Sequence, residues 1–294
     1  MNGIIVIRKE KGYTSHDVVA KLRGILHMKK IGHTGTLDPE AEGVLPVALG
    51  KGTRLVELLT EKEKTYETVM RLGFSTDTQD MTGRVLEEKE VSVTEEEIKK
   101  AAASFLGEQL QVPPMYSALK VNGKKLYELA REGKEVERKA RPVHFYQIEI
   151  LEMNLPLVKI RVSCSKGTYI RTLCHDMGEK LGCGGAMEAL LRTKSGDFTL
   201  EQSLTLREVE EAVKSGTIEE KIISVEEVLS SYPAVYAEKE GERLLANGNP
   251  LHEGLVKGEV RQGWVRMYTS GGVFIGIYQW KQNRQQYFPV KMFV

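Results

Sequence analysis

The chain has 294 residues, with 42 Lys or Arg against 41 Asp or Glu, so its formal net charge at pH 7 is +1. This balance excludes a uniformly basic protein, but it permits a local basic face that acidic segments elsewhere offset. The apolar stretch at the N-terminus is too short for a signal peptide, and no apolar run approaches the roughly 20 residues of a membrane-spanning helix.

The first predicted element is a strand over residues 4–7. Thr14 then supplies a helix N-cap, with Asp17 three residues later as its capping-box partner. The helix that follows carries an apolar stripe at helical spacing, formed by Val18, Val19, Leu22, Ile25 and Leu26. Further on, the glycine-bounded apolar run at 43–50 predicts a buried supporting segment.

Residues 66–73 alternate between apolar and polar and predict a strand, which a polar turn at 75–78 follows. Thr94 opens a second capping box and a helix that we expect to continue through residue 106. The alternation at 158–162 predicts another strand.

The sequence from 171 to 181 predicts a helix that ends at Gly182. Residues 201–231 are acidic and helical in pattern, and a glycine-punctuated, β-rich segment begins near Tyr232. Strands and helices alternate without βαβ regularity, so we predict an α+β fold with a mixed or antiparallel sheet. We place a domain boundary there, with one domain at 1–231 and a small one at 232–294.

Cys164, Cys174 and Cys183 are odd in number and lack paired C-x-x-C spacing. A disulfide framework and a zinc site are therefore not expected. We expect a cytoplasmic protein with reduced thiols and no membrane association.

The octapeptide at 32–39, Gly-His-Thr-Gly-Thr-Leu-Asp-Pro, holds one carboxylate, Asp38, in a turn-rich segment. Pro39 fixes its own φ and pushes Asp38 toward an extended conformation. The apolar run at 43–50 follows directly, so a charged side chain is expected beside a buried wall. This combination is typical of a prepared site, although a turn or capping aspartate would show the same local pattern.

A second feature is the basic segment at 112–142, which carries eight Lys or Arg residues against four Glu in a nearly neutral chain. Tyr116 and Tyr127 are interleaved with the charges. Such a segment neutralises phosphates and gives nucleic-acid affinity with little sequence selectivity. A solvated helical face would also carry such charges.

Three segments together resemble the TruB family, the synthases that make pseudouridine at position 55 of the tRNA T-loop. The octapeptide at 32–39 resembles the catalytic motif of that family, residues 64–67 (Lys-Thr-Tyr-Glu) its tyrosine segment, and residues 164–172 its third motif. The order and separation of the segments also match. The resemblance extends to 112–142, and weakly to a C-terminal module that begins near Tyr232.

The resemblance implies a pseudouridine synthase catalytic domain with a thumb-like insertion at about 112–142, followed by a PUA-like RNA-binding domain. It implies isomerisation of a flipped-out uridine with Asp38 as nucleophile, and with Arg171 as the cation that keeps Asp38 ionised. Tyr66 would stack on the target ring and take part in proton transfer. The chemistry requires no metal and no cofactor.

Further substrate contacts follow from the same resemblance. His33 would occupy the space that the flipped base vacates, and Leu190 would be an apolar pocket residue. Tyr169 would line the pocket, because in an extended segment it faces the same side as Arg171. The thumb lysines Lys124 and Lys125 would grip the tRNA.

One departure from the family pattern lies near the N-terminus, where Lys-Pro-x-Gly-x-Thr-Ser is usual. Lys9 is present and is expected to contact the substrate, but Glu10 stands where proline is expected. This substitution puts the rigidity of the loop in question, and it leaves the catalytic assignment intact.

Each site residue also has a plainer interpretation that the residues alone leave open. Tyr66 suits a half-buried strand, His33 suits a loop where it bonds to local backbone, and Leu190 suits an ordinary core. At the level of function, the alternatives are an RNA-binding or RNA-folding module and a guide-RNA-dependent relative that acts on rRNA. We expect a monomeric, stand-alone enzyme that binds the T-arm and elbow of tRNA without a guide RNA.

Overall fold

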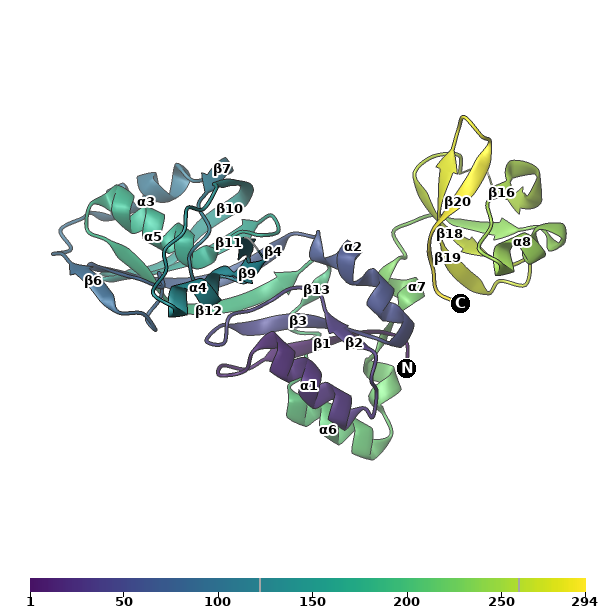
Figure 1. Ribbon diagram of the computed structural model, residues 1–294, viewed down its shortest axis with the longest axis horizontal. Helices are drawn as coiled ribbons and strands as arrows, with labels where there is room; N and C mark the ends of the chain where they lie inside the picture. Colours follow the sequence, from purple (N-terminus) through teal and green to yellow (C-terminus); the bar gives the residue numbers. More distant parts are fainter. Residues whose placement is uncertain (122, 259) are drawn as a thin grey trace.

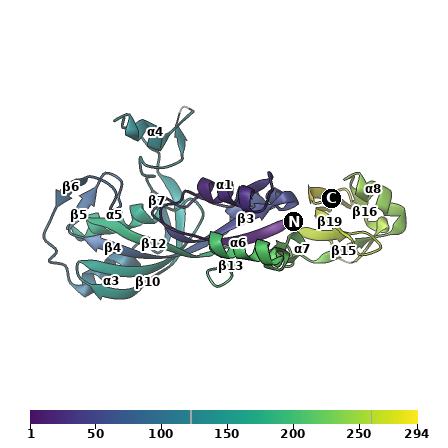
Figure 2. The same cartoon turned by 90° about the horizontal axis from the view of Figure 1, so that it is seen from below.

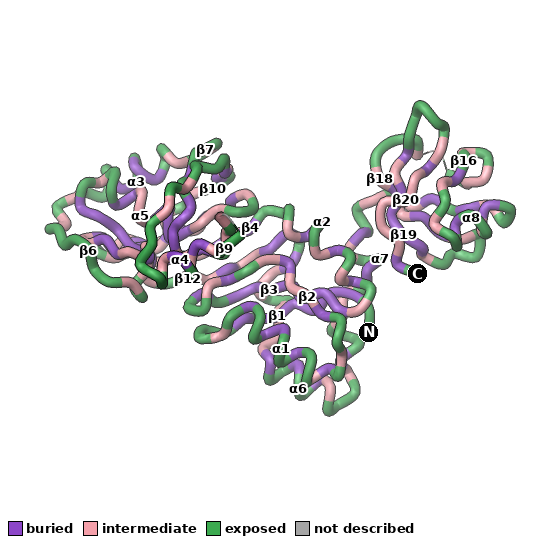
Figure 3. The backbone as a smooth tube through the Cα atoms, in the orientation of Figure 1, coloured by how far each residue is buried: buried purple, intermediate pink, exposed green. Residues whose placement is uncertain are grey.

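The computed structural model describes residues 1–121, 123–258 and 260–294. The molecule is elongated, with two lobes built on one large sheet and a third lobe at the C-terminal end (Figure 1). Strands β1 (Gly3–Lys9) and β3 (Glu42–Leu49) are almost wholly buried, whereas the long strand β10 (Arg141–Asn154) is largely half-buried or exposed (Figure 3). No helix in the described ranges is long and apolar enough to cross a membrane.

The large sheet has eight strands in one path and two attached strands. In spatial order the path is β14 (Ile223–Ser224), β1 (Gly3–Lys9), β3 (Glu42–Leu49), β12 (Gly185–Ser195), β4 (Lys64–Leu72), β11 (Leu157–Cys164), β10 (Arg141–Asn154) and β7 (Gly107–Gln111). The attached strands are β2 (Ile31–His33) on β3 and β13 (Phe198–Thr199) on β12. The pair β12–β3 is parallel and the other pairs are antiparallel, so the predicted α+β fold with a mixed sheet is confirmed.

Two helices cover one end of this sheet: α1 (Ser15–Ile25) and α6 (Leu206–Ser215). The predicted capping box at Thr14 is confirmed, because the Thr14 hydroxyl accepts from the Asp17 N–H and the Asp17 carboxylate accepts from the Thr14 N–H. The apolar stripe of α1 packs with α6 and the inner side chains of β1 and β3. This core fixes the strands from which the segment around Asp38 departs.

The other end of the sheet is covered by α3 (Glu95–Ala103) and α5 (Ile170–Leu181). Residues of β4 alternate between buried and half-buried, as the sequence predicts. The α5 helix ends at Gly182, whose φ of 78° lies in the left-handed region that glycine adopts without strain.

Strand β12 joins the two ends of the sheet at Leu191 and Arg192, because each of these residues pairs with both β3 and β4. Arg192 is opposite Tyr66 of β4 in an antiparallel pair and opposite Gly43 of β3 in a parallel pair. A Cβ on Gly43 would lie 2.2 Å from the Arg192 carbonyl oxygen, so only glycine permits this approach.

The segment 112–140 leaves and re-enters the sheet at one point, because Gln111 of β7 pairs with Arg141 of β10. It contains β8 (Lys120–Val121), β9 (Lys124–Lys125) and α4 (Leu126–Arg131), and it stands away from the sheet (Figure 2). Its own small core is formed by Met115, Leu126 and Leu129. We call this excursion the thumb.

The chain then reaches the C-terminal lobe through η2 (Ile218–Lys221) and α7 (Val225–Val228). The lobe is a six-stranded sheet in the order β16 (Leu251–His252), β20 (Gln286–Met292), β19 (Phe274–Lys281), β18 (Trp264–Tyr268), β15 (Ala234–Ala237) and β17 (Val256–Lys257). It also holds η3 (Lys239–Gly241), α8 (Glu242–Ala246) and η4 (Glu253–Leu255). The predicted boundary at 232 falls in the connection between α7 and β15 and stays a prediction.

The C-terminal lobe packs against η1 (Gly50–Leu55) and α2 (Val56–Thr60). Ile277 and Phe293 share an apolar cluster with Leu55 and Leu59. Lys291 also forms an ion pair with Glu57 at 2.9 Å between Nζ and Oε2.

Some predicted boundaries are wrong. Ser75 and Thr76 belong to β5 (Phe74–Thr76), which pairs with β6 (Val85–Glu88), so the turn begins later than predicted. The helix α3 ends at Ala103, three residues before the predicted end at 106. Its C-cap is Ser104, whose hydroxyl donates to the Ala101 carbonyl. Gly107 then turns the chain into β7 at a φ of 86°. The acidic stretch 201–231 is helical only in part, because β14 interrupts it.

Candidate active site

A pocket of about 330 Å³ opens at the junction of the two sheet ends. Its walls come from the segment after β2, from β4, from β12, from the thumb and from the turn that leads into α5. The predicted site residues among its lining are Asp38, Tyr66, Tyr169, Arg171 and Leu190. Residues from five separate parts of the chain thus meet in one cavity.

Asp38 and Arg171 form an ion pair in this pocket, with 2.9 Å between Oδ2 and Nη2. The Arg171 side chain is only 6% exposed, whereas that of Asp38 is 39% exposed. Burial raises the pKa of Asp38, and the Arg171 guanidinium opposes that rise. The ion pair therefore presents a carboxylate whose ionised form a buried cation stabilises.

Hydrogen bonds from neighbouring segments fix the backbone around Asp38. The Leu37 N–H donates to the Ser15 hydroxyl at 2.9 Å, and the Ala41 N–H donates to the Asp38 carbonyl at 3.1 Å. Lys9 Nζ donates to the carbonyls of Glu10 and Pro39, each at 3.0 Å. These bonds fix the direction in which the Asp38 carboxylate points.

Lys9 was expected to contact the substrate, and its position differs from that expectation. The residue is 1% exposed and its ammonium is committed to the two carbonyls, so it supports the segment carrying Asp38 from inside the protein. Burial lowers the pKa of Lys9 to about 8, although the nearby Glu42 and Asp38 carboxylates favour the charged form.

Arg171 lies in the first turn of α5, where it also approaches Asp80 at 3.7 Å between Nη1 and Oδ2. Asp80 is itself fixed by the hydroxyls of Thr78 and Thr82, at 2.7 and 2.6 Å. The guanidinium is thus held between two carboxylates. No sequence pattern selected Asp80, because the predicted polar turn stopped at residue 78.

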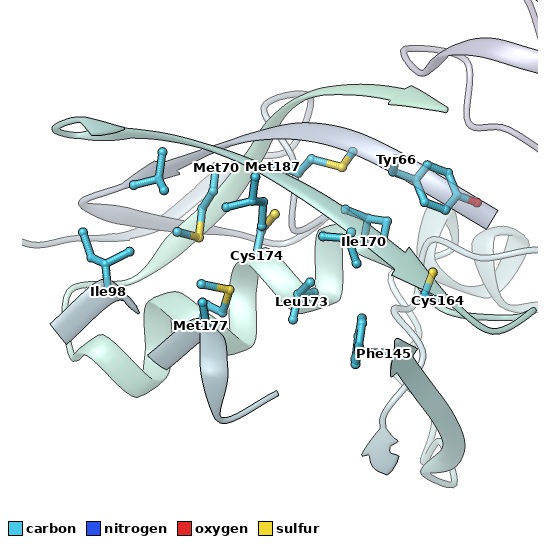
Figure 4. Packing of buried hydrophobic residues seen from close by; sticks show 14 of the residues in the cluster. Tyr66, Met70, Ile98, Phe145, Cys164, Ile170, Leu173, Cys174, Met177 and Met187 are labelled. Carbon is cyan, nitrogen blue, oxygen red and sulfur yellow. The ribbon is translucent and has the colours of Figure 1, made fainter. Parts of the chain in front are cut away.

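Tyr66 is 8% exposed, and its phenolic oxygen points away from the apolar cluster that holds the ring (Figure 4). Burial raises the pKa of Tyr66, and the Arg192 guanidinium opposes that rise. Leu190, two residues before Arg192 on β12, packs against the same cluster and lines the pocket, so its core role and its pocket role coincide.

Tyr169 is the N-cap of α5, and Arg171 lies within the helix, so the assumption of an extended segment was wrong. Both residues nevertheless line the pocket, with 5.9 Å between the guanidinium carbon and the centre of the Tyr169 ring. The Gln111 side chain fixes Tyr169 by accepting from its N–H at 2.8 Å and donating to its carbonyl at 3.0 Å. Gln111 is thus a supporting residue that the sequence did not reveal.

Besides Lys9, three predicted substrate contacts lie outside the pocket lining. His33 ends β2, stacks edge-to-face with His16 at 5.1 Å between ring centres, and accepts from the Gly35 N–H. Burial lowers its pKa. Lys124 and Lys125 lie in the thumb, where Lys124 approaches Glu132 and Lys125 donates to the Tyr127 hydroxyl.

Within the described residues, no group of three or more His, Cys, Asp or Glu side chains is placed to hold a metal ion. The pocket lining combines the Asp38 carboxylate with guanidinium groups, ammonium groups, phenols and apolar side chains. Such a lining suits a flat, polar base, because aromatic rings can stack on its face and charged groups can hydrogen-bond to its edge.

The chain is similar to known proteins over its full length. The family model "TruB family pseudouridylate synthase (N terminal domain)" matches residues 23–170, and "tRNA pseudouridylate synthase B C-terminal domain" matches 171–233. The tRNA pseudouridine synthase B of Lachnoclostridium phytofermentans is 52% identical over the whole of both chains. That of Clostridium novyi is 48% identical over 94% of this chain and 95% of its own.

Solved structures show the same fold at lower identity. The chain that matches in a Cbf5-Nop10-Gar1 complex superposes with a TM-score of 0.76 at 29% identity, over 99% of this chain and 85% of its own. One in an H/ACA RNP bound to a substrate RNA superposes with a TM-score of 0.73 at 28% identity, with the same coverage. Family models, full-length relatives and fold agree, and the chain belongs to the TruB family of pseudouridine synthases.

Proposed function

We propose that Asp38, Tyr66 and Arg171 are the catalytic residues with which this tRNA pseudouridine synthase isomerises uridine 55 of the T-loop. The observation that carries the proposal is the ion pair of Asp38 with the buried Arg171 in a pocket that Tyr66 also lines. The relatives that are 43–52% identical are tRNA pseudouridine synthases, which supports tRNA as the substrate.

The reaction breaks the N1–C1′ bond, turns the base and joins C5 to C1′. The C5 hydrogen leaves as a proton and N1 gains one, so no electrons are exchanged with a second reagent. Attack by Asp38 at C1′, attack at C6 and stabilisation of an eliminated sugar intermediate all need the same ionised carboxylate. Arg171 supplies the charge that favours this form.

The target uridine must leave the T-loop to enter a pocket that several segments of the chain enclose. Tyr66 then stacks on the base and handles its protons, while Tyr169 and Leu190 complete the walls. His33 lies just before the turn that carries Asp38, where it is placed to fill the gap that the flipped base leaves in the RNA. The apolar and aromatic walls also exclude water from the reacting atoms.

The thumb and the C-terminal lobe provide the RNA grip in this proposal. Lys124 has an exposed side chain on the thumb, and the thumb residues Ser117, Ala118 and Leu119 line the pocket itself. The RNA-binding surface of the thumb is therefore adjacent to the catalytic pocket. Residues 232–294 act as a PUA-like domain that contacts the tRNA.

The enzyme acts without a guide RNA in this proposal. The full-length relatives named for tRNA are much closer in sequence than the chains of H/ACA particles, which are 28–29% identical. This difference supports a stand-alone tRNA enzyme over a subunit of a guided particle.

The test uses purified protein and a transcribed T-arm hairpin with no other RNA present. After digestion to nucleosides, chromatography should show about one pseudouridine per hairpin. A matched hairpin with cytidine at position 55 should give none. Absence of product from the first hairpin, or product from both, would overturn the assignment of substrate and position.

A further inference from the structure

Arg192 is a buried cation without a carboxylate partner. It is 1% exposed, and the ion pairs within 1–121, 123–258 and 260–294 include none to its guanidinium. Nε donates to the Val44 carbonyl at 2.7 Å, while Nη2 is buried and has no hydrogen-bond partner among the described residues. Burying an uncompensated charge is strongly destabilising. A structural role alone would be served by an apolar residue.

The surroundings of Arg192 make its charge more costly. Its guanidinium lowers the pKa of Lys9 on β1 and of Lys64 on β4, after burial as the main cause, and it also acts on His33 of β2. Cys164 on β11 faces the same region with its pKa raised to about 12 by burial, so it is neutral. Arg192 therefore lies near the cations Lys9 and Lys64, and the carboxylates of Glu42 and Asp38 act on Lys9.

The position of Arg192 connects it to Tyr66. The two residues are directly opposite in the β12–β4 ladder, so their side chains project from the same face of the sheet as nearest neighbours. Both line the pocket. A Cβ on Gly35 would lie 3.8 Å from Nη1, so the segment before Asp38 also passes close to the guanidinium.

We propose that Arg192 is a positioning residue that acts through Tyr66, fixing the phenol in the pocket and stabilising its phenolate while Tyr66 moves a proton between N1 and C5 of the base. The inference rests on the proposed function of Tyr66. This role explains why Arg192 is buried without a carboxylate partner, because its negative partner, the Tyr66 phenolate, forms only during the reaction. The Asp38 carboxylate opposes a phenolate on Tyr66, and Arg192 counters it.

The proton balance needs no further reagent. Cleavage of N1–C1′ leaves the bonding electron pair on N1, which takes the phenolic proton, and Tyr66 becomes a phenolate. Rotation of the base about its C6–N3 axis places C5 where N1 stood, and C5 bonds to C1′ as the bond to the enzyme carboxylate, if formed, breaks. The phenolate then accepts the C5 proton, the C5–H electron pair returns to the ring, and Tyr66 is a phenol again.

The experiment measures single-turnover rates on T-arm hairpins that carry either hydrogen or deuterium at C5 of uridine 55. Arg192→Met should slow the reaction by about 10²-fold, within the range for general acid–base catalysis. It should also raise the deuterium isotope effect above that of wild type, because C5–H cleavage then limits the rate. Hairpin affinity should stay within about threefold.

Two further variants keep the test decisive. Arg192→Lys keeps the charge, so it should lose about tenfold in rate and show an intermediate isotope effect; it decides the matter if Arg192→Met does not fold. Arg71→Met is the matched control, since Arg71 lies on β4 outside the pocket and pairs with Glu188. It should match wild type in rate and isotope effect.

A wild-type isotope effect in the Arg192 variants would overturn the inference, as would a loss of affinity that accounts for the whole loss of rate. The second result would make Arg192 a group that binds the base directly. Failure of the proposed function is distinguishable, because wild-type protein would then form no pseudouridine from either hairpin.

Discussion

The pocket and the thumb use the same kinds of charged residue in opposite surroundings. In the pocket, the side chain of Arg171 is 6% exposed and Arg192 is 1% exposed. On the thumb, the side chains of Lys124 and Lys134 are each 60% exposed. Both regions meet at one cavity, to which the thumb contributes Ser117.

This difference supports the separate tasks that we propose for the two regions. Exposed ion pairs such as Lys134 with Glu132 contribute little to folding and are readily exchanged for phosphate contacts. The pair of Asp38 with the buried Arg171 has fixed geometry and a less screened field, which suits chemistry. Variants in the pocket should therefore change rate, and variants on the thumb should change affinity.

The largest effect is expected for Asp38→Asn. The amide cannot act as a nucleophile, so turnover should fall by more than about 10³-fold, on the scale seen when a catalytic nucleophile is removed. Affinity for the T-arm should stay within a few fold, because the carboxylate is proposed to take part in the chemistry and not in RNA binding. Single-turnover kinetics and a binding titration measure the two quantities, and normal turnover would contradict the nucleophile assignment.

Asp80→Asn should have the next largest effect. Loss of one of the two carboxylates around Arg171 should misplace the guanidinium and slow turnover by up to about 10²-fold. The Asp80 charge also raises the pKa of Asp38, so its removal lowers that pKa. Because Asp38 would then stay ionised at lower pH, the acid limb of the plot of kcat against pH should move to lower pH. An acid limb that stays in place would contradict the coupling between Asp80 and Asp38.

The thumb is tested by the double variant Lys124→Ala and Lys125→Ala. The affinity for the hairpin should fall by about tenfold. The slope of log binding constant against log salt concentration should become shallower by about one for each lysine that no longer neutralises a phosphate, and so by up to about two. The rate at saturating enzyme should not change. The matched control is Lys99→Ala with Lys100→Ala, two exposed lysines on α3. An equal loss of affinity in the control would show only a general effect of charge.

The smallest effect is expected for Thr94→Ala. Thr94 caps α3, accepting from the Glu97 N–H at 3.3 Å, and its loss should cost about 1 kcal/mol in the free energy of unfolding. Denaturant titration measures this cost. Turnover and affinity should both match wild type, because α3 contributes to neither the pocket nor the thumb; a change in turnover would mean that the sheet transmits strain to the site.

The sequence predicted the site best where its signals are local. Asp38 could be selected from the octapeptide around it, and the capping boxes at Thr14 and Thr94 predicted two helix starts correctly. Tyr169 and Arg171 do share the pocket, although the assumed extended backbone was wrong because α5 begins between them.

The sequence was least informative where long-range pairing decides the surroundings. Lys9 has the pattern of a surface lysine, and it is buried only because β1 pairs with β3 behind the segment that carries Asp38. Arg192 has the pattern of a solvent-facing strand residue, and its burial follows from the position of β12 between β3 and β4. Asp80 and Gln111 acquire their roles from partners about 90 and 58 residues away.

The central claim is that the buried pocket performs the chemistry and the exposed thumb supplies the grip. The most direct measurement is release of tritium from C5 of uridine 55 in a T-arm hairpin, compared between wild type, Asp38→Asn and the Lys124/Lys125 double variant. At saturating enzyme, wild type and the double variant should release tritium at the same rate, and Asp38→Asn should release none. Release by Asp38→Asn, or a slow double variant at saturation, would contradict this division.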